Sequence, residues 1–485
     1  MKNIIRIYVI ALLAATTGCA KFVELDPPVN SISDRTAYTT NATATSVITG
    51  ILYNMTVNTD FVHGVSGVGL LTGMGSDELK YYQASQGNLE FAKNSLLADN
   101  SYVSGIWARC YKLIYAANAA IEGVTASPTI SEPVKRQLTG EARFLRAFCY
   151  FYLVNLYGDV PVPVTTDYKV NITLPRKPVQ DVYQQIIQDL KDAQALLENE
   201  YLSATNAVTA DRVRPNKFAA TALLARAYLY AGDWANAESS ATEVINQTGT
   251  YKLEENMNET FLVRSKEAIW QLGLAANGSG INTWDGNILI IRTSPVTGYP
   301  GLALSASQMD VLAGDKRQAS WTDLFAADGT TYPYPFKYKV YQATGNSPTT
   351  EHTMVLRLAE QYLIRAEAKA MQGRISGTDG GVADINAVRS RAEQTGVSAT
   401  TLPEFMLALE RERRLELFTE MGHRWFDIKR WKGFSNTSIT RADEIMPAIA
   451  AAKGGVWKPE YKLWPIPASE LNVNVNLTPN PGYGL

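Results

Sequence analysis

The sequence has few of the residues that most often carry catalysis or cross-link a small fold. Only three histidines and three cysteines occur among 485 residues, so neither a histidine-based metal site nor a disulfide framework is expected. Charge of one sign is also missing, because 45 Lys and Arg stand against 47 Asp and Glu. A nucleic-acid-binding protein needs an excess of basic side chains to replace phosphate counterions. That class of protein is therefore excluded.

The remaining composition is that of an ordinary globular protein. Hydrophobic residues make up 46% of the chain and charged residues 19%, which argues against a disordered or coiled-coil chain. Tyrosine is abundant, with 25 copies. After the first twenty residues, no apolar run is long enough for a transmembrane helix, which needs about 20 residues.

The N-terminus reads as an export signal. Lys2 and Arg6 give a positively charged start, and residues 4–15 form a short apolar segment, interrupted only by Arg6, that is too short to span a bilayer. Gly18 directly precedes Cys19, and a small residue before a cysteine resembles a bacterial lipoprotein signal. We predict that residues 1–18 are removed and that Cys19 is lipidated. The alternative is a simple secretory signal that is cut nearby.

Helical periodicity dominates the rest of the chain. Apolar residues recur at three- and four-residue steps, which is typical of amphipathic helices. In one such segment Phe144, Phe148, Tyr152 and Leu156 fall four apart and predict a single buried stripe. The predicted helical segments are residues 99–122, 135–157, 179–200, 217–246, 357–373, 382–392 and 402–421.

The two other cysteines, Cys110 and Cys149, lie within such helical patterns. Buried free thiols behave as small hydrophobic side chains, and we favour that interpretation. A disulfide between these two cysteines is the alternative in an exported chain.

Residues 217–246 have the offsets of a tetratricopeptide (TPR) repeat, a pair of closely packed helices. Small alanines line both predicted helices, Gly232 lies at the turn, and Tyr228 and Trp234 fill the space between them. The same plan recurs over residues 357–392. Because one pair cannot cover its own apolar faces, several pairs must stack. The predicted fold is mainly α, with a few short strands.

Residues 56–98 and 247–352 differ from the helical parts. The longer segment is rich in Gly, Asn, Thr, Pro and aromatic residues, and short alternating runs such as 334–341 suggest strands. Trp270 is predicted to lie in a core strand. Long loops on a rigid scaffold often carry function, so we expect the ligand-binding face here.

No catalytic motif is found. The three histidines, His63, His352 and His423, are scattered and have no metal-ligating partner at helical spacing. The charged cluster over residues 410–430 is interpreted as a structural network, because opposite charges at three- and four-residue steps pair within or between helices. We predict a protein that is not an enzyme and has no catalytic residue, metal or cofactor.

Four segments in order resemble the RagB/SusD family of outer-membrane nutrient-binding lipoproteins. They are residues 141–161 (EARFLRA through YGDVP), 357–368 (RLAEQYLIRAEA), 412–427 (ERRLEL through GHRWFD) and 464–483 (WPIP through NPGY). The resemblance implies a TPR-bearing α-helical SusD-like fold with a loop-rich ligand face. It divides the chain into residues 1–18 (signal), 19–246 and 247–485, the last two packed as one globular unit.

The same resemblance implies a function. The protein would be anchored in the outer membrane of a Gram-negative bacterium through the lipid on Cys19, bind oligosaccharide and deliver it to a TonB-dependent SusC-like barrel. Three alternatives remain: a TPR scaffold that binds protein, an uptake lipoprotein that binds peptide, and a secreted glycoside hydrolase.

Ligand residues are predicted from their chemistry. Aromatic rings stack on the apolar face of a sugar, and such a contact contributes about 0.5–1.5 kcal/mol. Trp284 lies among small and polar residues, where a large ring has little local reason to be unless it stacks on a ligand. Its alternative role is that of a loop anchor packed on the helices. The predicted ligand-binding residues are Trp284, Asn282, Tyr81, Tyr82 and Tyr299.

Overall fold

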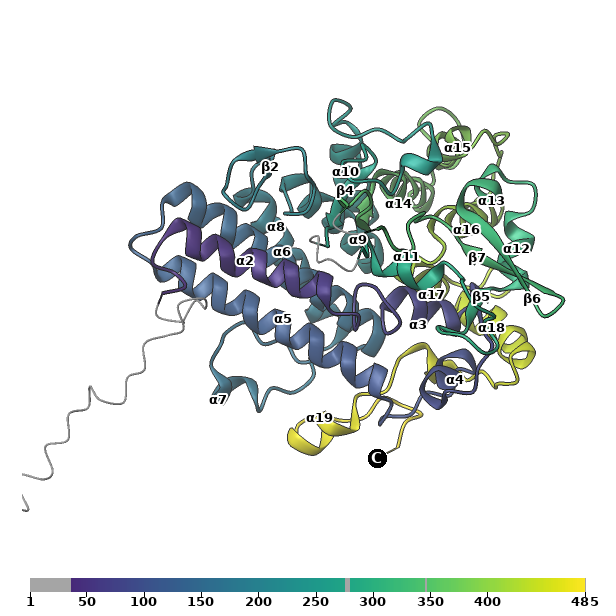
Figure 1. The fold of residues 1–485 in the computed structure, drawn as a ribbon, viewed down its shortest axis with the longest axis horizontal. Coiled ribbons are helices and arrows are strands. Elements are labelled where there is room, and N and C mark those ends of the chain that lie inside the picture. The colour runs from purple at the N-terminus through teal and green to yellow at the C-terminus, as the bar shows by residue number, and fades with distance from the viewer. Residues whose placement is uncertain (1–35, 275–279, 345–346, 485) are drawn as a thin grey trace, which may run out of the picture.

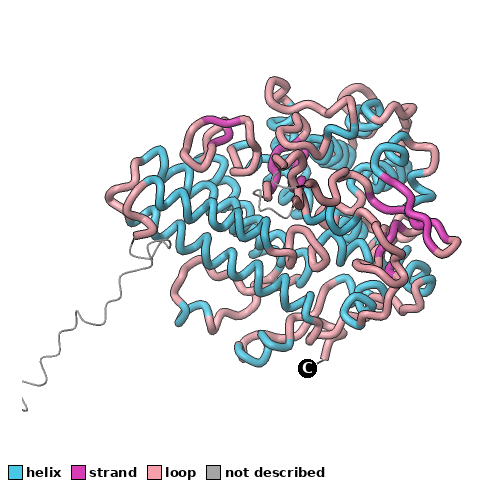
Figure 2. The backbone as a smooth tube through the Cα atoms, in the orientation of Figure 1, coloured by secondary structure: helices cyan, strands magenta, loops and turns pink. Residues whose placement is uncertain are grey.

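The computed structural model describes residues 36–274, 280–344 and 347–484. Helices form most of the molecule, and strands are short and confined to a few places (Figure 2). The predicted mainly α fold is confirmed. The signal segment and Cys19 lie outside the described residues, so the lipid anchor stays a prediction.

The first half of the chain supplies long helices that pack side by side (Figure 1). Helix α6 lies between α5 and α8, and α9 continues the row from α8. The helices of this half are α2 (Asn41–Val57), α3 (Val68–Gly75), α4 (Gln86–Ala92), α5 (Ser101–Ala126), α6 (Glu132–Tyr157), α7 (Tyr168–Asn171), α8 (Val179–Leu196), α9 (Lys217–Ala231) and α10 (Trp234–Ile245).

The second half continues the row through α14 and α15 and then surrounds it with shorter helices. These helices are α11 (Trp284–Leu289), α12 (Ala306–Leu312), α13 (Lys316–Trp321), α14 (Leu358–Met371), α15 (Gly381–Arg391), α16 (Leu402–Leu417), α17 (His423–Arg430), α18 (Arg441–Ala452) and α19 (Ala468–Val473), with 3₁₀ turns η2 (Met257–Glu259) and η3 (Pro459–Lys462).

Local sequence explains where these helices begin and end. Asn216 caps α9 by accepting a hydrogen bond from the Ala219 N–H. Gly232 ends α9 with a φ of 78°, a left-handed conformation that favours glycine. The α9–α10 and α14–α15 pairs have the predicted helix-pair geometry, while their assignment as TPR repeats stays a prediction.

The predicted stripe on α6 is buried, and so is most of the rest of that helix. Phe144, Phe148, Tyr152 and Leu156 are inaccessible to solvent or nearly so, as are Tyr150 and Phe151 on other faces. Because α5, α8 and α9 contact α6 from different sides, the helix is a central core element rather than an amphipathic surface helix.

Four antiparallel strand pairs complete the fold. They are β1 (Leu79–Tyr81) with β5 (Leu302–Leu304), β2 (Tyr201–Leu202) with β3 (Val208–Thr209), β4 (Ala268–Leu272) with β8 (Thr353–Arg357), and β6 (Thr322–Ala327) with β7 (Thr330–Pro335). Trp270 lies fully buried in β4, which confirms its predicted core strand.

The loop-rich segments differ in detail from the sequence-based expectation. The strand predicted at 334–341 is displaced, because β7 ends at Pro335 and Lys337 then turns inward to bind backbone carbonyls of Glu416 and Phe418. Residues 56–98 contain two short helices, α3 and α4, among their loops. Helix α3 was missed because its glycines weaken the helical pattern; they are fully buried, and a Cβ at Gly69 would lie 3.0 Å from the Thr419 oxygen.

One hydrophobic core draws on the whole described chain, from Ala44 to Leu477. Residues of both 19–246 and 247–485 contribute to it, while the boundary between them stays a prediction. Cys110 and Cys149 are buried and not disulfide-bonded, which confirms the preferred interpretation of these thiols.

A buried ionic network joins α16 to its neighbours, as the charge pattern predicted. The carboxylate of Glu416 is fully buried and forms ion pairs with the guanidinium groups of Arg317 at 2.8 Å, Arg357 at 2.6 Å and Arg391. Burial by itself would raise the pKa of Glu416, but the three guanidinium groups hold that pKa well below its usual range. Each of the three arginines has a further carboxylate partner, among them Glu412, Glu267 and Glu420.

Candidate functional site

Aromatic side chains gather where β5 lies between β1 and β7, at the right edge of Figure 1. We call this cluster the aromatic face. Its aromatic members are Tyr82, Phe325, Tyr332, Tyr334, Phe336 and Tyr341. Tyr332 and Tyr334 are buried and form the floor, while the other four remain partly accessible.

Tyr82 is a partly exposed ring held in a defined orientation. Its edge meets Tyr332 at a centroid distance of 5.3 Å, and the Lys80 ammonium lies 4.7 Å from its centroid. The Tyr82 N–H donates to the Gly301 oxygen at 2.9 Å. Partial burial raises the pKa of Tyr82, and Tyr332 raises it further. The phenol is therefore neutral and able to donate at physiological pH.

Tyr299 lies on the loop that precedes β5 and is 72% exposed. The Gln83 amide donates to the carbonyl oxygens of Pro295 and Gly298 and so ties this loop to the residue after Tyr82. Gly301 has a φ of 77°, and a Cβ there would meet the Gln83 side chain at 2.6 Å. Glycine is required at position 301 because a larger residue would not allow the Gln83 side chain to lie so close. The loop that carries Tyr299 is thus held beside the residue that follows Tyr82.

Tyr81 directly precedes Tyr82 but points the other way, because successive strand residues face opposite sides. Its hydroxyl accepts a bond from the Asn88 amide at 3.4 Å, and its ring packs against the main core.

Trp284 and Asn282 are turned inward. The Trp284 indole N–H donates to the Thr56 oxygen of α2 at 3.0 Å, and the ring packs on the main core. Asn282 is buried, and its amide donates to the Thr350 hydroxyl at 2.8 Å. These contacts give both residues the anchoring role that was the alternative for Trp284. A ligand contact by either residue stays a prediction.

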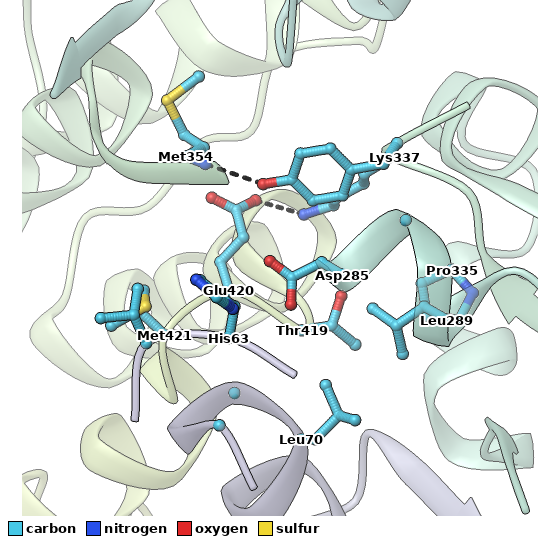
Figure 3. Close-up of a pocket in the computed structure, with 15 residues that line it drawn as sticks. His63, Leu70, Asp285, Leu289, Pro335, Lys337, Met354, Thr419, Glu420 and Met421 are labelled. Carbon is cyan, nitrogen blue, oxygen red and sulfur yellow. Dashed lines mark hydrogen bonds and ion pairs between the residues drawn. The ribbon is translucent and has the colours of Figure 1, made fainter. Parts of the chain in front are cut away.

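A small polar cavity lies under α11, where the helix meets the scaffold (Figure 3). It has a volume of about 20 Å³, which suits about one water molecule. Asp285 from α11, His63, Lys337 and Glu420 converge on it from different segments.

Burial shifts the pKa values of two side chains that line this cavity. It raises the pKa of Asp285 to about 7, with a further contribution from Glu420, and it lowers the pKa of His63 to about 4. His63 is therefore neutral near neutral pH, while Asp285 keeps its proton at a pH well above that at which an exposed aspartate loses it. With a volume of about 20 Å³ the cavity is too small for an oligosaccharide.

Sequence reasoning missed most of the aromatic face. Tyr332, Tyr334 and Phe336 alternate along the chain, and that period-2 pattern could have indicated rings on one side of a strand. Tyr82 joins them only through tertiary packing.

The structure shows neither a metal cluster nor a membrane span within its described ranges. No group of three or more His, Cys, Asp or Glu residues there is placed to hold a metal ion. No helix in those ranges is both long and apolar enough to cross a bilayer.

Two family models match the chain. One, described as starch-binding associating with outer membrane, matches residues 71–229, and one described as the SusD family matches residues 318–483. Together they span about two thirds of the sequence. The chain belongs to the SusD family.

Characterised relatives of this SusD-family chain match it over most of its length. SusD-like protein P25 of Formosa agariphila is 26% identical, covering 98% of this chain and 97% of its own. The starch-binding protein SusD of Bacteroides thetaiotaomicron is 25% identical, covering 75% of this chain and 74% of its own.

Solved structures agree in fold with this SusD-family protein. A SusD superfamily protein from Bacteroides vulgatus superposes with a TM-score of 0.75 at 21% identity, covering 91% of this chain and 99% of its own. A laminarin-binding SusD-like protein gives 0.71 at 23% identity, covering 92% and 100%. These likenesses support the fold alone.

Proposed function

We propose that this SusD-family protein binds oligosaccharides at the aromatic face without cleaving them. The observation that carries the proposal is the link made by Gln83, which ties the loop of the exposed Tyr299 to the segment of the partly exposed Tyr82. Rings stack on the C–H faces of pyranoses, and the neighbouring Lys80 and Arg292 supply hydrogen-bond donors for hydroxyl groups.

The names of similar proteins support this ligand class. One relative is a starch-binding protein, one similar structure is laminarin-binding, and another is a surface glycan-binding protein of Bacteroides fluxus. We extend carbohydrate binding to this chain as a proposal, with Trp284, Asn282 and Tyr81 holding the surrounding segments in place.

The proposal includes location and partner. A lipid on Cys19 would tether the protein to the outer membrane at the cell surface, and a TonB-dependent SusC-like barrel would receive the oligosaccharide. Co-purification of the tagged full-length protein from outer membranes tests the partnership, since a barrel-sized partner is expected. Replacement of Cys19 by Ala should release the protein from the membrane fraction, and its retention would contradict lipid anchoring.

Binding is tested with the mature protein on affinity gels and by calorimetry, using laminarin and soluble starch as probes. We expect the double variant Tyr82→Ala/Tyr299→Ala to lose affinity about tenfold, because two stacking contacts contribute about 1–3 kcal/mol together. Tyr53→Ala is the matched control, since this α2 tyrosine is 55% exposed and lies outside the aromatic face.

Unchanged affinity of the double variant, with a native circular dichroism spectrum, would place the ligand elsewhere. Release of reducing ends from a bound polysaccharide would instead favour the glycoside hydrolase alternative. Binding of peptides without binding of any glycan would favour the peptide-importing alternative.

A further inference from the structure

A second groove lies between α5, α7 and α19, along the lower edge of the molecule in Figure 1 and away from the β6–β7 pair. We call it the tyrosine groove. It has a volume of about 340 Å³, within the range of sites for small ligands. The residues that matter to the argument are Tyr111, Tyr115, Tyr168, Asn171 and Glu470.

Hydrogen bonds hold the walls of the tyrosine groove in place before any ligand binds. Tyr111 of α5 donates to the Pro161 oxygen at 2.7 Å, and the Asn118 amide donates to the oxygens of Pro163 and Thr165. The Asn474 amide, just after α19, donates to the Leu174 oxygen, just after α7, at 2.9 Å. This bond joins the α19 wall of the groove to the α7 wall. A preformed groove loses little conformational entropy when a ligand binds.

Two aromatic rings of this groove are exposed. Tyr115 is 55% exposed and Tyr168 is 69% exposed, and Ile172 and Val473 beside them are also exposed. A cluster of exposed apolar surface that is rimmed by polar groups marks a binding site.

The free polar groups of the groove are acceptors. The Asn171 amide nitrogen donates to the Thr165 oxygen at 2.8 Å, while its Oδ1 atom is buried and has no partner. The Glu470 carboxylate has neither a hydrogen bond nor an ion pair with any residue that the structure describes. A buried acceptor without a donor costs about 1–3 kcal/mol, so a donating ligand would be favoured at this position.

The lining also selects against acidic ligands. Among its described residues there is no lysine or arginine, and Glu470 is the one charged group. Carboxylated or sulfated sugars would bring a second negative charge beside Glu470 without a cation to offset it.

We propose that the tyrosine groove is a second carbohydrate-binding site, which takes one or two neutral pyranose units of a glycan. Tyr115 and Tyr168 stack on the C–H faces, and sugar hydroxyls donate to Asn171 Oδ1 and to the Glu470 carboxylate. The ligand class rests on the proposed function, while the position is independent of the aromatic face. Two separated sites on one chain raise the affinity for a long polymer through effective concentration.

The test compares four mature proteins: wild type, Tyr82→Ala/Tyr299→Ala, Tyr115→Ala/Tyr168→Ala and the combination of all four substitutions. Binding of laminarin and soluble starch is measured by calorimetry. We expect Tyr115→Ala/Tyr168→Ala to weaken polymer binding about fivefold to tenfold, and the combined variant to bind more weakly than either double variant. Tyr53→Ala is again the exposed-tyrosine control.

Hydroxyl-radical footprinting locates the ligand independently of affinity. Saturating polymer should protect Tyr115 and Tyr168 in the wild type and leave Tyr53 unchanged. If neither tyrosine is protected, and the combined variant binds like Tyr82→Ala/Tyr299→Ala, the tyrosine groove is not a ligand site although the proposed function stands. If Tyr82→Ala/Tyr299→Ala binds like wild type while the groove tyrosines are protected, the groove stands and the aromatic face fails. If no neutral glycan binds the wild type, both proposals fail.

Discussion

The ionic network around α16 and the aromatic face use polar and apolar groups in opposite ways. The network buries Glu416 completely among three arginines, each with a further carboxylate partner. The aromatic face leaves Tyr82 partly exposed, and Tyr299 on the loop before β5 is mostly exposed. The helical scaffold hides charge and the aromatic face displays rings, which are the reverse of the usual positions of these groups.

The difference follows from the free-energy cost of burying a charged group. A buried charge is tolerated only when its partners surround it, so the network ties α13, α15, α16 and β8 into one arrangement. An exposed ring contributes little to folding and remains available for a ligand. Substitutions should therefore change stability in the first region and affinity in the second.

The largest expected effect is on the network. Glu416→Gln removes the charge that three guanidinium groups share, and we expect the free energy of unfolding to fall by about 3–5 kcal/mol. Denaturant unfolding of the mature protein measures it. The matched control is Glu132→Gln, whose side chain is 78% exposed in a pair with Lys135 and should lose about 1 kcal/mol or less. Equal losses in the two variants would break the contrast between buried and exposed charge.

The second largest expected effect concerns Asp285, in the small cavity under α11, and it tests the comparison where the two regions meet. Because the pKa of Asp285 is raised to about 7 in the folded protein, the folded state binds a proton that the unfolded state releases near pH 4. The stability supplied by this group is complete below about pH 4 and is lost as the pH rises to about 7.

Asp285→Asn should therefore gain stability relative to wild type as the pH rises from 4 to 8, by about 2–4 kcal/mol. Unfolding curves across that range measure the difference. Asp310→Asn, on the exposed side of α12, is the control for loss of a carboxylate at the surface. A flat profile for Asp285→Asn would mean that Asp285 is ionised in the folded state.

The smallest expected effect concerns Trp284. A substitution there tests whether this residue anchors its loop or contacts the ligand. Trp284→Phe keeps a ring but loses the bond to the Thr56 oxygen, so stability should fall by about 1 kcal/mol. Glycan affinity should stay within twofold of wild type on affinity gels. A tenfold loss of affinity at unchanged stability would restore Trp284 as a ligand contact.

Helices and strands were predicted where the chain carries a strong periodic signal. The segments at 135–157 and 179–200 became α6 and α8 with boundaries shifted by a few residues. The burial of Trp270 also followed from its neighbours in sequence. In contrast, α3 carries a weak signal, and its place depends on the close approach of Gly69 to Thr419.

The candidate site was less predictable than the fold. Tyr82 and Tyr299 were both singled out, but the link between their segments depends on Gln83 bonds to a loop more than 200 residues away. Trp284 looked like a surface ring because its neighbours in sequence are small and polar. Its indole in fact reaches α2, a contact that no local pattern reports.

The sequence by itself determined the helical architecture, the family and the absence of a recognisable catalytic motif, because periodicity and short motifs are properties of neighbouring residues. Only the tertiary structure decided which rings are exposed, which charges are buried and where Tyr115, Tyr168 and Glu470 form a groove. Those features arise from contacts between segments far apart in the chain, whose energies depend on packing and desolvation rather than on local order.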